Sequence, residues 1–182
     1  STQTYTSRYA QLRGDIMIDI KGPEANAFFN SKRCRYLDVE EILQAVSKAL
    51  HRVEDSIQNT EDEFADHFAV FLMSCILDDI SKLVLFGPKG MERKDLKFSH
   101  LRNQSELKNM WDFSSDLSII VVKSNKSRFQ RLQNVYQKRN SEVAHTCIPY
   151  SCARIDVIYN DLESLCKEIG IFLELNLGGG DQ

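Results

Sequence analysis

The chain has 182 residues, of which 42% are hydrophobic and 27% charged, a balance that predicts one soluble globular domain large enough to bury a core. Its formal net charge of −3 argues against a surface that coats nucleic acid, although a small basic site can still act on a single phosphate. Eight glycines and three prolines are few for a β-sandwich and ordinary for a helical protein.

The cysteines and histidines argue against disulfides and metal centres. The five cysteines are scattered without a Cys-x-x-Cys pair, and no signal-like sequence opens the chain, so we expect reduced thiols in a cytoplasm. Cys147 and Cys152 lie near His145, but the four histidines do not pair at metal-ligand spacings, so we predict no metal and no cofactor. No run approaches the ~20 apolar residues of a membrane helix.

The first half of the chain predicts an N-terminal arm followed by two helices. Residues 1–36 are mixed and polar, and we expect an arm there. Asp38 followed by Glu41 resembles a capping box, and apolar residues then recur at helical spacing for five turns. A second capping box, Thr60 to Glu63, predicts the start of another helix, which Gly87 and Pro88 end.

This second helix is apolar nearly all round in its middle, which predicts a place at the centre of a bundle or against a partner subunit. We expect its broad buried face to consist of Phe64, Phe68, Phe71, Leu72, Cys75, Ile76, Ile80, Leu83 and Val84.

The stretch from residue 88 to residue 114 predicts a polar connector with one short helix over 106–113. Trp111 in that helix suits the core better than a base-stacking surface. The β-branched run 119–122 has no neighbouring strand candidate, so we expect a helical turn or an extended connector.

Two amphipathic helices complete the pattern. The first spans 127–144, and its apolar positions fall within about a third of the helix circumference. The second follows Pro149, with Ser151 as its expected cap and apolar residues through five turns. Residues 178–182 predict a flexible tail. The sequence therefore predicts a single all-α domain over residues 1–182, an antiparallel bundle of four to five main helices.

One charged residue interrupts the apolar face of the 127–144 helix. Arg139 lies in the middle of that face, and a guanidinium there needs an acceptor because it cannot lose its charge. His145, six residues later, carries the side chain best suited to move protons near neutral pH. The alternative is a basic helix C-terminus that complements the helix dipole. Arg93 and His100 have a similar spacing, but they lie in a polar stretch without apolar periodicity.

The sequence Arg139-Asn140-Ser141-Glu142-Val143-Ala144-His145, at the end of the penultimate long helix, resembles the motif of HEPN domains. That motif is an Arg, usually followed by a polar residue such as Asn, and then a His after four to six intervening residues. The resemblance covers residues 127–175 and is nearest to the stand-alone HEPN proteins of bacterial toxin and anti-phage systems.

The resemblance implies a metal-independent endoribonuclease that acts as a homodimer, with Arg139 and His145 of both subunits in one composite cleft. His145 would transfer the proton while the RNA 2′-OH attacks phosphorus, and Arg139 would stabilise the phosphoryl charge. Asn140 would orient the histidine or bind phosphate. The products would be a 2′,3′-cyclic phosphate and a 5′-OH.

Geometry places one condition on this reading. On a straight helix Arg139 and His145 lie about 120° apart, so the helix must end or bend near Ala144 for them to converge. Candidates to hold the RNA backbone are the basic residues near the motif, with ordinary solvated cations as the alternative: Lys123, Lys126, Arg128, Arg131 and Lys138.

Two other interpretations stay open from the sequence. One is a catalytically silent HEPN-like module that docks a partner such as an antitoxin or a nucleotidyltransferase. The other is a purely structural helical dimer with Arg139 in an interface salt bridge.

Overall fold

The computed structural model describes residues 38–93, 95–102 and 111–178. The chain divides into two compact units, Ser1–Tyr36 and Leu37–Gln182, and the described residues belong to the second. The predicted N-terminal arm, most of the predicted 106–113 helix and the end of the predicted tail lie outside the described residues. Whether the chain is a single domain with an arm therefore stays a prediction. The described residues are all-α and contain no strand, which confirms the predicted fold class.

The first described helix, α3 (Val39–Gln58), begins where the sequence predicts. The side chain of Asp38 caps it by accepting a hydrogen bond from the backbone N–H of Glu41 at 2.8 Å. Its apolar residues recur every three or four positions, so that one face is buried against α4 (Ala65–Phe86) and α7 (Ile155–Leu177). The buried residues are Ile42, Val46, Leu50 and Val53.

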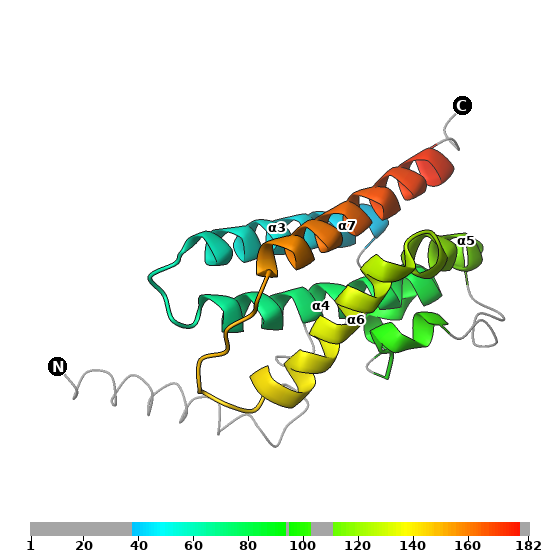
Figure 1. Ribbon diagram of the computed structural model, residues 1–182. Coiled ribbons are helices and arrows are strands. Elements are labelled where there is room, and N and C mark those ends of the chain that lie inside the picture. Colours follow the sequence, from blue (N-terminus) through cyan, green and yellow to red (C-terminus); the bar gives the residue numbers. More distant parts are fainter. Residues whose placement is uncertain (1–37, 94, 103–110, 179–182) are drawn as a thin grey trace, which may run out of the picture. The chain divides into compact units, whose positions relative to one another are not determined.

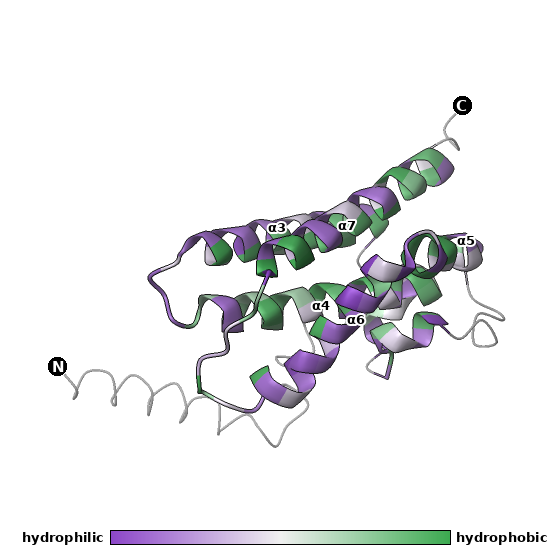
Figure 2. Ribbon diagram, in the orientation of Figure 1, coloured by the Kyte–Doolittle hydropathy of each residue, from purple (hydrophilic) through white to green (hydrophobic). Residues whose placement is uncertain are grey.

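Helix α4 is the central element of the bundle, as its apolar sequence predicts. It packs against α3, α6 (Lys126–Lys138) and α7, and Figure 2 shows it as mostly hydrophobic along its length. The predicted capping box at Thr60 is wrong, because α4 begins at Ala65 with no side-chain cap. The carboxylate of Asp62 instead accepts from the N–H of Phe64 at 2.9 Å, which stabilises the preceding turn.

The four long helices alternate in direction along the chain (Figure 1). The tight turn after α3 returns the chain along α4, α6 runs back, and α7 runs out again toward the C-terminus. The predicted Ser151 cap of the last helix is wrong. Helix α7 begins at Ile155, and its N-cap, Arg154, has a left-handed backbone with φ 57°.

Short helical segments connect α4 to α6: η1 (Gly87–Glu92), η2 (Phe98–Arg102), α5 (Ser114–Ser118) and η4 (Ile119–Lys123). Residues 119–122 are therefore helical, which confirms the helical turn among the two predicted alternatives. Gly87 ends α4 with φ 69°, and a Cβ there would lie 2.8 Å from the ring of Trp111. The indole N–H of Trp111 donates to the carbonyl of Val84 at 3.0 Å, which fits the predicted core role.

The first half of α4 buries a different face from the predicted one, whereas Ile76, Ile80, Leu83 and Val84 in its second half are buried as predicted. Phe64, Phe68 and Phe71 remain 39%, 49% and 40% exposed, while the opposite side of the helix faces the core. The buried residues there include Val70, Met73 and Leu77. No helix among the described residues is both long enough and apolar enough to cross a membrane.

Candidate functional site

The backbone changes its helical geometry at Arg139. Helix α6 ends at Lys138 and passes directly into η5 (Arg139–Val143), a π-helical turn closed by a 2.8 Å hydrogen bond from the N–H of Ala144 to the carbonyl of Arg139. Ala144 and His145 then form a turn that leaves the helix. The helix therefore ends near Ala144, where convergence of Arg139 and His145 requires it.

The guanidinium of Arg139 is held on the surface of α4. Its central carbon lies 5.5 Å from the centroid of the Phe71 ring, a cation–π contact. Nη1 donates to the side-chain oxygen of Asn140 at 2.8 Å, while Nε is buried and has no hydrogen-bond partner among the described residues. That hydrogen bond uses one of five donors, so the side chain is fixed in place but retains donors for an anion.

Beneath Arg139 lies a small polar cluster on α4 and α6. The hydroxyl of Tyr136 donates to Asp78 at 2.6 Å, and burial, together with this hydrogen bond and the charge of Asp78, raises the pKa of the phenol. Burial also raises the pKa of the Cys75 thiol, while the positive charge of Arg139 acts in the opposite direction. Both groups therefore stay neutral near pH 7, and Arg139, Asp78 and Asp79 all lie close enough to act on the Cys75 thiol.

The remaining predicted site residues lie around the π turn with their side chains exposed. Lys138 pairs with Glu142 at 3.1 Å across the turn, and His145 is exposed just after it. Asn140 contacts Arg139, so its observed hydrogen bond positions the guanidinium and does not orient the histidine. Within one chain the structure shows no hydrogen bond between Arg139 and His145.

An exposed aromatic stripe adjoins Arg139. It consists of Phe64, Phe68 and Phe71, at the N-terminal end of α4, and Phe71 is the residue that contacts Arg139. Ile148, in the connection that follows His145, is 72% exposed. Exposed large apolar side chains grouped along one helix face, as the three phenylalanines are, commonly mark an interaction surface. The periodicity of α4 identified these residues as apolar but assigned them to the core.

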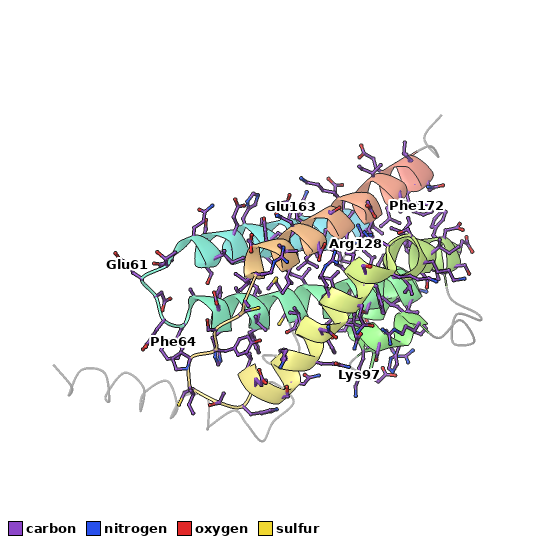
Figure 3. The ribbon with its side chains drawn as sticks, viewed as in Figure 1. Glu61, Phe64, Lys97, Arg128, Glu163 and Phe172 are labelled. Atoms are coloured by element: carbon purple, nitrogen blue, oxygen red, sulfur yellow. The ribbon has the colours of Figure 1, made fainter. Side chains whose placement is uncertain are left out.

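Arg128, a predicted RNA-backbone ligand, is a structural residue instead. It is 3% exposed and lies between α6 and α7 (Figure 3). Its two terminal nitrogens donate to the carboxylate oxygens of Glu168 at 3.0 and 2.8 Å, and one of them also donates to the carbonyl of Ile120 at 3.2 Å. The guanidinium therefore joins α6, α7 and η4 and is not accessible to RNA.

The other predicted ligands of the RNA backbone lie at different distances from Arg139. Lys126 is exposed and begins the helix, so at 1.5 Å per residue it lies about 20 Å from Arg139 along the helix axis. Lys123 is exposed in η4, before the helix. Arg131 and Lys138 are nearer the π turn and line one groove with Arg154. Arg131 forms an ion pair with Asp161, with hydrogen bonds of 2.6 and 3.0 Å.

The second Arg–His pair has a different environment. Arg93 is engaged with Asp95 through two hydrogen bonds of 2.8 and 2.7 Å, and Nδ1 of His100 accepts from the N–H of Lys97 at 3.1 Å. These local contacts satisfy both side chains. Among the residues that the structure describes, no group of three or more His, Cys, Asp or Glu side chains is placed to hold a metal ion.

Comparison of the chain with protein-family models, with curated proteins and with solved structures gave no match.

Proposed function

We propose that the protein is a metal-independent endoribonuclease of the HEPN type, with a composite Arg139–His145 site at a homodimer interface. The observation that carries the proposal is the π turn at Arg139. It interrupts α6 at the first residue of the motif, directs the guanidinium to the exposed aromatic stripe and leaves His145 exposed just beyond. A toxin or anti-phage role is the biological setting that the motif favours.

The aromatic stripe supports the dimer. Phe64, Phe68 and Phe71 present an apolar surface whose burial against a second copy would be favourable. Because Arg139 contacts Phe71, an interface over this stripe includes the guanidinium. Two copies related by a two-fold axis would each contribute the same surface, so both motifs would approach one shared cleft.

The chemistry follows from the side chains available there. Arg139 supplies fixed N–H donors for the charge that develops on the phosphoryl oxygens, and its contacts with Phe71 and Asn140 fix the guanidinium in advance. His145 takes the proton from the 2′-OH or gives it to the leaving 5′-oxygen. The expected products are a 2′,3′-cyclic phosphate and a 5′-OH.

The test is cleavage of RNA by the full-length chain in excess EDTA, with analysis of the product ends. We expect cleavage to persist and the 3′ fragments to carry 5′-OH ends, because neither proposed catalytic group needs a metal. Loss of cleavage on chelation, restored by Mg²⁺ or Mn²⁺, would refute the proposed mechanism.

The exposed aromatic stripe also favours a second candidate, the silent module that docks a partner protein. His145 distinguishes the two candidates, because a docking surface centred on Phe64, Phe68 and Phe71 does not require its side chain. Under the docking reading, no RNA cleavage would depend on His145.

A further inference from the structure

A groove between α6 and α7 collects basic side chains that neither the core nor the aromatic stripe uses. It has a volume of about 360 Å³, and its walls come from the second half of α6, the 144–154 connection and the first turn of α7. Its charged lining residues are Arg131, Lys138 and Arg154. This volume is at the lower end of the range of ligand pockets.

The three cations differ in how far they are already neutralised. Arg131 is paired with Asp161, and Lys138 with Glu142, and both cations are half or nearly half exposed. Arg154 is exposed and takes part in no ion pair among the described residues. Arg154 is therefore the one of the three cations without an ion-pair partner among the described residues, and the other two have donors to spare.

The rest of the lining is suited to a base. Tyr150 and Cys152 are half-buried lining residues, Asn134 adds a side-chain amide, and Val135, Val157 and Ile158 add apolar surface. Burial raises the pKa of the Tyr150 phenol further above its ordinary value, so the side chain is uncharged near neutral pH. An aromatic face with an amide and adjacent cations is the combination that binds a nucleotide of a single strand.

The groove is held in place by contacts from both sides. The backbone N–H of Cys152 donates to Asp66 of α4 at 2.8 Å, which ties the 144–154 connection to the central helix. Arg154 is the N-cap of α7, and its left-handed backbone (φ 57°) directs the chain from the connection into the helix. The connection that carries Tyr150 and Arg154 is therefore anchored at Cys152 and at the start of α7.

We propose that this groove binds one nucleotide of the single-stranded RNA substrate, with Arg154 contacting a phosphate and Tyr150 stacking on a base. The inference rests on the proposed nuclease function and extends it. Lys138 lines the groove and directly precedes Arg139 in the chain, so the groove begins one residue from the motif.

The test measures binding of a short fluorescein-labelled single-stranded RNA by anisotropy at several salt concentrations. It uses the His145→Ala protein, so that the RNA stays intact. Arg154→Gln should weaken binding and reduce the slope of log K against log salt by about 0.7, the amount for one phosphate contact on a single strand. Arg52→Gln, an exposed arginine on α3 outside the groove, is the charge-matched control and should change neither.

Tyr150 tests the base contact separately. Tyr150→Ala should weaken binding about 5- to 150-fold, the range for loss of one stacked base, while Tyr150→Phe should retain the affinity. Circular dichroism checks that each variant is folded, and if Tyr150→Ala is not, Arg154→Gln decides.

Two results would overturn the proposal. One is an Arg154→Gln salt dependence equal to that of Arg52→Gln, and the other is tighter binding of an acidic peptide than of RNA to the groove. Either result leaves the nuclease proposal standing if cleavage still requires His145, so the two failures are distinguishable.

Discussion

The guanidinium carbon of Arg139 lies 5.5 Å from the centre of the Phe71 ring, which joins the motif to the exposed aromatic stripe of α4. The Arg139 side chain thus adjoins an apolar surface and also supplies a cation with N–H donors for a phosphate. A dimer that buries the stripe would also remove water from around Arg139, and less water strengthens its interaction with an anion.

Phe71→Leu should reduce RNA cleavage while the dimer persists. Leucine keeps an apolar surface but loses the cation–π contact that positions Arg139. We expect a two- to fivefold lower kcat, which corresponds to ~0.5–1 kcal/mol for such a contact. Phe64→Leu is the control, because Phe64 lies in the same stripe and shows no contact with Arg139. Equal kcat for the two variants would contradict this role of Phe71.

Phe68→Glu should convert the protein to a monomer and abolish cleavage. Phe68 is 49% exposed in the single chain, so a carboxylate there leaves the fold intact but places two charges in the proposed interface. Light scattering reports the mass. Leu175→Glu is the matched control, because Leu175 is 75% exposed on α7, away from the stripe. A wild-type protein that is already monomeric, or a dimer lost only in Leu175→Glu, would refute the proposed interface.

Glu168→Ala should lower the free energy of unfolding by about 2 kcal/mol, because it leaves the buried Arg128 without its carboxylate. The value is reduced from that of a fully buried pair since Glu168 is 45% exposed. Asp161→Ala leaves Arg131 without its partner, but Arg131 is 44% exposed and solvated, so stability should change much less. Urea denaturation measures both, and equal losses would contradict the structural role of Arg128.

The same ion pair has a pH signature. The hydrogen bond from Arg128 lowers the pKa of Glu168 below its ordinary value of 4.5. A lowered folded-state pKa contributes stability above the unfolded value, which is lost as pH falls through the folded one. The difference in unfolding free energy between the wild type and Glu168→Gln should therefore be full at neutral pH and shrink below about pH 4.5.

Local signals in the sequence were sufficient for much of the fold. Asp38 and Glu41 lie within one turn, and their capping geometry depends on nothing farther away, so the start of α3 was predicted correctly. The Gly87 end of α4 and the buried face of α6 follow from equally local patterns. The apolar centre of α4 was likewise enough to predict its central position.

The errors involve contacts between distant residues. Periodicity cannot decide which side of an all-apolar helix faces neighbours, so Phe64, Phe68 and Phe71 were assigned to the wrong side of α4. Arg128 had the sequence environment of a solvated cation, and its partner Glu168 is forty residues away. The π turn at Arg139 depends on which carbonyl each backbone N–H donates to, and the sequence pattern does not determine this. The end of the helix near Ala144 was predicted.

The most direct test of the central claim is the rate of RNA cleavage by His145→Ala. Loss of a general acid–base should reduce the rate at least ~10²-fold. The fold should be unaffected, because the side chain of His145 is exposed and makes no hydrogen bond among the described residues. His100→Ala, from the second Arg–His pair, should cleave at the wild-type rate. A His145→Ala protein that is folded and cleaves RNA as fast as the wild type would contradict the proposed function.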